Sequence, residues 1–200
     1  MTGPHILIFS GSIRTGSKNV RLAELLAAAL PDYGGVPQLV SLRDFEMPIY
    51  NGDIEAQSGA PEAAWRLAEL MSDHDGIIIV SPEYNASIPP LLKNTLDWVS
   101  RVRPAQGVNL APFRRPVFAL AGASPGAIGT LRGMTATRSM LELGFGALVI
   151  PEQLAVPLAA QAFSETGQLI AERPLVMMQK MLTSLVHKAQ ALQKVESHAT

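Results

Sequence analysis

The chain has 200 residues, with sixteen Lys and Arg against seventeen Asp and Glu, and it has no cysteine. A hydrophobic fraction of 48% with only 16% charged residues excludes an intrinsically disordered chain. The net charge of −1 argues against a nucleic-acid partner, and the lack of cysteine excludes disulfides, Fe–S clusters and thiolate nucleophiles. We therefore expect a single domain over residues 1–200, located in the cytoplasm and without a membrane span.

Apolar strands and amphipathic helices alternate along the chain. In chain order, the pattern predicts a strand at 5–10, a helix at 18–30, a strand at 38–42, a helix at 61–71, a strand at 76–81, a helix at 89–101, a strand at 116–121, a loop and helix at 126–144, a strand at 147–150 that is extended or bulged toward 157, and a helix at 175–195. This alternation predicts an α/β fold, namely a flavodoxin-like three-layer α/β/α sandwich with a five-stranded parallel sheet of order 2-1-3-4-5.

In such a sheet the ligand crevice lies at the carboxyl ends of strands 1 and 3, where the winding reverses. Functional residues are therefore expected directly after Ser10 and directly after Ser81.

The segment 10–19 joins the first strand to the first helix and is rich in hydroxyl side chains and glycine. A helix N-terminus presents unpaired N–H groups, to which Ser12, Ser17 and Arg14 add further donors. This combination favours a phosphate monoester, while the spacing matches neither a P-loop nor a Rossmann dinucleotide motif. The alternative is that Ser17 only caps the helix and that the rest is a solvated turn.

The segment 82–90 follows the third strand and places an aromatic and an amide between prolines. Tyr84 is suited to lie near a ring, and Asn85 to hydrogen-bond the edge of a pyrimidine; the alternative is a proline-rich turn that caps the next helix. A phosphate site beside a planar-ring site suggests a flavin mononucleotide.

Residues 11–19 and 81–89, continued by 92–98, resemble the NADPH-dependent FMN reductase family, which includes bacterial quinone, chromate and azo reductases. The resemblance implies a tightly held FMN, NADPH or NADH as the co-substrate, and a homodimer or homotetramer with active sites near the subunit interfaces.

The matching positions imply which residues bind the cofactor. The phosphate would be held by Ser12, Arg14, Ser17, Lys18 and Asn19, the ring would be lined by Pro82, Glu83, Tyr84 and Asn85, and a third loop would add Ser124 and Gly126. Two positions depart from the family pattern, because Ala123 stands where a serine is usual and Pro90 where a glycine is usual.

The function implied is hydride transfer from NAD(P)H through bound FMN to quinones, azo compounds, metal oxyanions or free flavin. The cofactor carries this chemistry, so no catalytic side chain is expected, and the four isolated histidines predict no metal site. The alternatives are a flavodoxin-type electron carrier, against which the near-neutral charge argues, and a redox-sensing flavin-binding module that does not turn over NAD(P)H.

Two further features concern the helix predicted at 89–101. Asp97 lies four residues after Lys93, a spacing that favours a local ion pair over a catalytic pair. Trp98 and its neighbours make this helix apolar on more than one side, which core packing explains in part and a partner subunit's helix in part.

Overall fold

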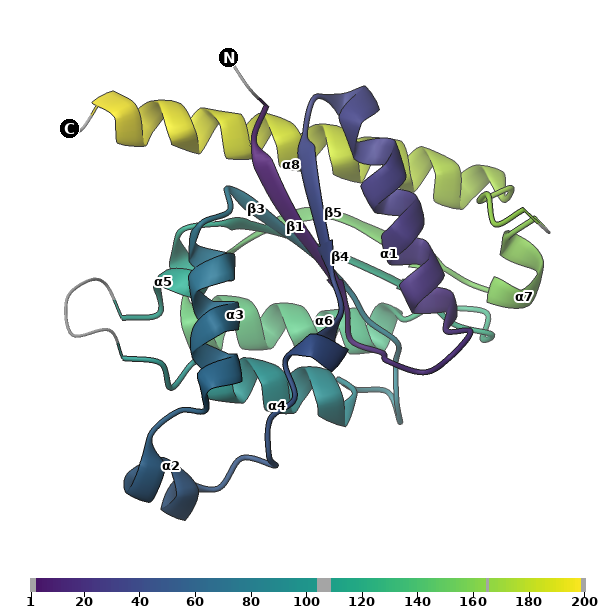
Figure 1. The fold of residues 1–200 in the computed structure, drawn as a ribbon. Helices are drawn as coiled ribbons and strands as arrows, with labels where there is room; N and C mark the ends of the chain where they lie inside the picture. The colour runs from purple at the N-terminus through teal and green to yellow at the C-terminus, as the bar shows by residue number, and fades with distance from the viewer. Residues whose placement is uncertain (1–2, 104–108, 165, 199–200) are drawn as a thin grey trace.

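The computed structural model describes residues 3–103, 109–164 and 166–198, and its centre is a five-stranded parallel sheet of order β2-β1-β3-β4-β5 (Figure 1). The predicted sheet and strand order are thereby confirmed. The strands are β1 (His5–Ser10), β2 (Val36–Val40), β3 (Gly76–Val80), β4 (Val117–Ala123) and β5 (Leu148–Val156). The α-helices are α1 (Lys18–Ala29), α2 (Gly52–Ser58), α3 (Glu62–Ser72), α4 (Pro90–Val99), α5 (Ala111–Arg114), α6 (Leu131–Ser139), α7 (Ala159–Ala162) and α8 (Glu172–His198).

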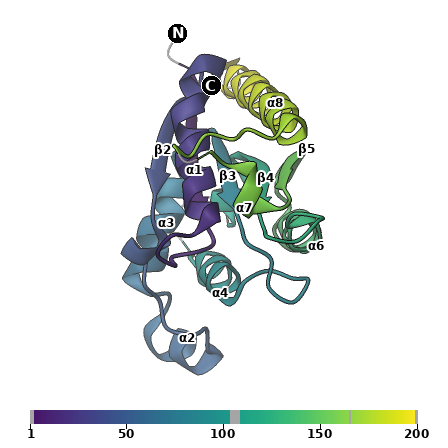
Figure 2. The ribbon, with the colours of Figure 1, turned by 90° about the vertical axis from the view of Figure 1, so that its right-hand side faces the viewer.

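Helices cover both faces of the sheet, with α1 and α8 on one side and α3, α4 and α6 on the other (Figures 1 and 2). Successive side chains of a strand point to opposite faces, so β1 contributes to both cores. Ile6 and Ile8 pack with α1 and α8, whereas Leu7 and Phe9 pack with α3 and α4. This explains why the central strands are apolar without alternation.

The edge strand β5 is longer than residues 147–150 and contains a bulge. Phe118 pairs with Val149 but Leu120 pairs with Gln153, so the register shifts between them. Arg138 of α6 donates to the carbonyls of Val149 and Ile150, at 3.4 Å and 2.8 Å. The side chain thus binds the carbonyl of Ile150, a residue that lies outside the paired register of β4 and β5.

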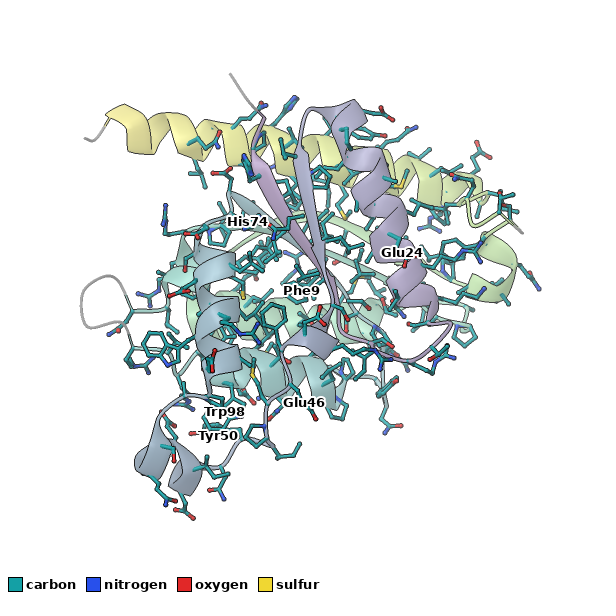
Figure 3. All side chains as sticks on the ribbon, viewed as in Figure 1. Phe9, Glu24, Glu46, Tyr50, His74 and Trp98 are labelled. Carbon is teal, nitrogen blue, oxygen red and sulfur yellow. The ribbon has the colours of Figure 1, made fainter. Side chains whose placement is uncertain are left out.

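Helix α4 is covered by a segment of its own chain. The carbonyl of Pro48 accepts hydrogen bonds from Trp98 Nε1 at 2.7 Å and from Asn94 Nδ2 at 2.9 Å. Tyr50 packs edge-on against Trp98 with ring centroids 5.0 Å apart. The two labelled residues lie next to each other in Figure 3. Trp98 is therefore a core residue; the predicted ion pair of Lys93 with Asp97 is present on the same helix at 2.6 Å.

Three short helices, α2, α5 and α7, were not predicted, because each is too short for a helical period to stand out. Over the described ranges, no helix is long and apolar enough to cross a membrane.

Candidate functional site

Three loops meet at the carboxyl end of the sheet, namely those that follow β1, β3 and β4 (Figure 2). Nine of the eleven residues predicted from the sequence line one cavity there. The full lining is Ser12, Arg14, Ser17, Lys18, Asn19, Pro82, Glu83, Tyr84, Ala123, Ser124, Pro125 and Ala159. We call this space the front cavity. The strand order thus brings together the two segments in which the sequence predicts functional residues, those after Ser10 and Ser81.

A second opening adjoins the front cavity on the side of Tyr84 and Arg14, which line both. It has a volume of about 450 Å³ and also borders Arg43, Pro89 and Leu91. The two openings together offer room for a molecule larger than either would hold alone.

The first loop is built to present the N-terminus of α1. Ser17 is the N-cap, and its hydroxyl accepts from the backbone N–H groups of Asn19 and Val20 at 3.2 Å and 3.4 Å. The first turn of α1 contains no acidic residue, so nothing there offsets the partial positive charge of the helix end. Gly16 has a φ of +68°, and no atom lies within 4 Å of where its Cβ would be, so the backbone is open at this point.

Arg14 lies exposed over this loop. Its guanidinium donates to the carbonyls of Thr15 at 3.1 Å and Gly16 at 3.4 Å. Both acceptors are uncharged carbonyls and the side chain is exposed, so the guanidinium can exchange these hydrogen bonds for stronger ones to an anion at the end of α1. The donor set of this loop fits a phosphate group.

The side-chain amide of Asn19 is bonded to the main chain of β4. The amide Nδ2 donates to Ala123 O at 2.9 Å, and Oδ1 accepts from Ala123 N–H at 2.8 Å, while the residue is only 4% exposed. The nitrogen and the oxygen of the amide are thus both hydrogen-bonded to the main chain of β4. The side chain thus joins the first loop to the third.

The second loop is a tight hairpin turn. Tyr84 and Ser87 exchange two backbone hydrogen bonds of 3.1 Å and 3.0 Å, and the two residues between them, Asn85 and Ala86, have φ values of 50° and 63°. This geometry is that of a two-residue turn in which both central residues are left-handed. The turn presents Tyr84, which is 49% exposed, to both openings, whereas Asn85 is not part of the front-cavity lining.

Ala86 carries a steric cost in this turn, because left-handed backbone is unfavourable for a residue with a Cβ. Ala86→Gly is expected to raise the free energy of unfolding by about 0.5–1 kcal/mol, the relief being partly offset by the freer unfolded chain. Denaturant unfolding measures this. Ala28→Gly, in the regular helix α1, is the matched control and should lower stability by about 1 kcal/mol; equal losses in both variants would contradict the assignment.

Glu83 lines the cavity, but its carboxylate faces α6. It accepts from Arg132 Nε at 2.8 Å and from the backbone N–H of Gly133 at 3.0 Å. Burial alone would raise the pKa of Glu83, but the hydrogen bond from Gly133 and the contacts with Arg132 together lower the pKa below its ordinary value. The charge of Glu83 therefore holds the second loop against the N-terminal turn of α6.

The third loop contributes Ser124 as predicted. Its hydroxyl donates to Gly129 O at 2.7 Å, which closes the loop on itself. Gly126 does not line the front cavity, and its carbonyl accepts from Leu158 N–H at 3.1 Å. Gly126 thus contacts the segment after β5, and its predicted contact with a ligand stays a prediction.

Sequence reasoning missed two residues that border the site. Arg43, at the carboxyl end of β2, donates to the carbonyl of Ile13 and so braces the first loop. The strand order places this end beside β1, so the topology contained a signal for it. Ala159 comes from α7, and no local pattern marked that residue.

The lining offers an anion site at the end of α1 and a flat aromatic surface at Tyr84 beside Pro82. Among the described residues, no group of three or more His, Asp or Glu side chains could hold a metal ion. The acid nearest the cavity, Glu83, is engaged by Arg132 and Gly133. The site can therefore bind a phosphorylated planar molecule, and its side chains hold the ligand in place.

A flavodoxin-like α/β/α sandwich with an anion site after β1 and an aromatic turn after β3 defines the class of FMN-binding flavoproteins. The pattern of the family described as NADPH-dependent FMN reductase matches residues 4–161. The chain belongs to this family. It is an FMN-dependent, NAD(P)H-dependent oxidoreductase, as the resemblance of the two loops indicated.

Curated relatives agree with this assignment. A quinone reductase of Escherichia coli K12 is 32% identical over 183 residues, which cover 90% of this chain and 92% of the relative. An NAD(P)H-dependent FMN reductase of Pseudomonas aeruginosa is 34% identical over the same shares of each chain. A 2-hydroxy-1,4-benzoquinone reductase of a Burkholderia species is 36% identical over 150 residues, covering 66% of this chain and 69% of the relative.

Among solved structures, FerB of Paracoccus denitrificans, a flavoenzyme NAD(P)H:acceptor oxidoreductase, superposes with a TM-score of 0.76 at 26% sequence identity. The match covers 94% of this chain and 98% of FerB.

Proposed function

We propose that this chain is an NAD(P)H:quinone reductase that holds FMN in the front cavity. The observation that carries the proposal is that nine residues predicted from three loops line one cavity with a helix N-terminus at its base. Relatives named as quinone reductases support a quinone as the acceptor. Bound FMN would supply the chemistry, accepting a hydride from the nicotinamide and passing the electrons to the quinone.

The residues of this chain bind and orient. Ser12, Arg14, Ser17 and Lys18 would hold the phosphate, partly through the backbone N–H groups of the first loop. Pro82 and Tyr84 would lie along the ring, and Ser124 would border it from the third loop. Asn19 and Glu83 would act indirectly, because their side chains hold the three loops together. No side chain needs to exchange a proton in the hydride step.

The proposal extends to assembly and location. A homodimer or homotetramer is supported by apolar side chains that stay exposed outside the front cavity, such as Ile13, Ile49 and Leu143. A cytoplasmic location is supported by the complete lack of cysteine, which suits a reducing compartment. Light scattering of the purified protein at several concentrations tests the assembly.

Reconstitution with FMN tests the function. The protein is saturated with FMN, desalted, and mixed anaerobically with NADPH or NADH before a benzoquinone is added. Retained flavin absorbance that bleaches with the nicotinamide and returns with the quinone is the expected result. Retained flavin that does not bleach would indicate an electron carrier or a sensor, and flavin that is not retained would contradict the assigned cavity.

Arg14→Ala tests the phosphate site. Loss of a charge-assisted hydrogen bond of about 1.5–3 kcal/mol should weaken FMN binding by roughly ten- to a hundredfold. Quenching of flavin fluorescence in a titration measures the dissociation constant. Arg103→Ala is the matched control, because the Arg103 guanidinium also bonds to a backbone carbonyl, Ser100 O, but borders neither opening. Unchanged FMN affinity in the Arg14 variant would remove this residue from the site.

A further inference from the structure

Another cavity with described walls is separate from the front cavity. It has a volume of about 530 Å³, within the range of small-molecule sites. Its walls come from the loop before α6, from β5, from α7 and from the first turns of α8 (Figure 1). The lining is Ala127, Ile128, Leu131, Gln153, Ala155, Pro157, Leu158, Gln161, Ala162, Ala171, Arg173, Pro174 and Met177. We call it the rear cavity.

The chemistry of the rear cavity is that of an apolar body with one charged end. Ten of its thirteen described lining residues are apolar, and the polar ones are Gln153, Gln161 and Arg173. Those thirteen include no Asp or Glu. Arg173 lies in the first turn of α8, and its guanidinium makes no hydrogen bond or ion pair with a described residue. A cation that no described residue pairs, set beside apolar walls, complements an apolar molecule with a single negative charge.

The rear cavity shares its wall with the front cavity. On the loop after β4, Ser124 borders the front cavity, whereas Ala127 and Ile128 border the rear one. On the segment after β5, Ala159 borders the front cavity and Leu158 the rear one.

Two hydrogen bonds connect these segments, from Ala159 N–H to Ser124 O at 3.0 Å and from Leu158 N–H to Gly126 O at 3.1 Å. Leu158 is held at a φ of 47°, a strained conformation for leucine. A ligand that packs on Leu158 and Ile128 therefore acts on the same two segments that border the front cavity.

We propose that the rear cavity binds an amphipathic monoanion, an aromatic or aliphatic body with one carboxylate or sulfonate group paired with Arg173. Its occupancy restrains the shared wall and so tightens the binding of FMN. The coupling rests on the proposed function of the front cavity, whereas the binding site itself does not. Because coupling between two sites is reciprocal, FMN must tighten the binding of the anion by the same factor.

Calorimetry with 8-anilinonaphthalene-1-sulfonate, an apolar monoanion, tests the site. We expect one saturable site per chain on the FMN-loaded protein, whose front cavity is filled. Arg173→Gln should weaken this binding about tenfold, as loss of a partly exposed charge-assisted contact does. Leu131→Glu, which places a negative charge on a 42% exposed lining residue, should abolish it. Lys180→Gln removes a charge from the same helix outside the rear cavity and is the matched control.

Four results would overturn the proposal. They are no saturable binding to the wild type, equal binding by the Arg173 and Lys180 variants, unchanged binding by Leu131→Glu, and binding that weakens as the protein concentration rises, which would mean that a second copy covers the cavity. The coupling is tested separately, by measuring the FMN dissociation constant with and without the probe. If the chain binds no FMN, titration of the apoprotein and its Arg173 variant still decides whether the rear cavity binds the anion.

Discussion

Replacing Asn19 with alanine is expected to lower the free energy of unfolding by about 2–4 kcal/mol and to weaken FMN binding at the same time. The substitution leaves the N–H and the carbonyl of Ala123 without their partners at 2.8 Å and 2.9 Å. Both groups are buried, and water does not replace the amide at low cost. The loss also separates the first loop from the third, so the donors around α1 no longer face Ser124 across the front cavity.

Denaturant unfolding of the apoprotein and FMN titration of the folded protein measure the two effects. Asn51→Ala is the matched control, because the Asn51 side chain accepts only one hydrogen bond, from Asp53 N–H at 2.8 Å, and lies exposed. It should cost about 1 kcal/mol as a lost helix cap and leave FMN affinity unchanged. Weaker FMN binding at unchanged stability would instead make Asn19 a direct ligand, and lower stability at unchanged FMN affinity would refute the coupling of the loops.

The features of the site that could be predicted are those that depend on residues close together in the sequence. Alternating strands and helices determine the strand order, and the strand order places the segments after Ser10 and Ser81 side by side. Within each segment, the residue types reveal their chemistry without knowledge of distant contacts, as with the hydroxyls and glycines before α1. Ser17, predicted to hold a phosphate with helix capping as the alternative, both caps α1 and lines the cavity.

The contacts that could not be predicted join segments far apart in the chain. Asn19 meets Ala123 across 104 residues, and Glu83 meets Arg132 across 49. No spacing rule relates such pairs, so the sequence did not show that the side chains of Asn19 and Glu83 hold loops together. The same holds for Ala159, whose helix α7 has only four residues and no period to recognise.

Glu83→Gln is expected to lower the free energy of unfolding at neutral pH by about 1–3 kcal/mol. The Glu83 side chain is only 6% exposed, and its two oxygens receive Arg132 and the N–H of Gly133. A glutamine keeps one acceptor oxygen but turns an NH₂ group toward one of these donors. The pKa of Glu83 is lower in the folded protein than its ordinary value of 4.5. The carboxylate therefore stabilises the fold at pH values above 4.5, and this contribution is lost as the pH falls through the pKa of the folded protein.

Unfolding measured from neutral to acidic pH tests both parts of this expectation. The difference in free energy of unfolding between wild type and Glu83→Gln should stay constant down to about pH 5 and then shrink. Protonation of Glu83 in the wild type removes the negative charge that the variant lacks at every pH. Glu142→Gln is the matched control: its partner Arg138 lies at 3.1 Å, but the Glu142 side chain is 40% exposed, so the effect should stay below about 1 kcal/mol. A difference that persists into acid would show that Glu83 stabilises the loop by packing instead of by its charge.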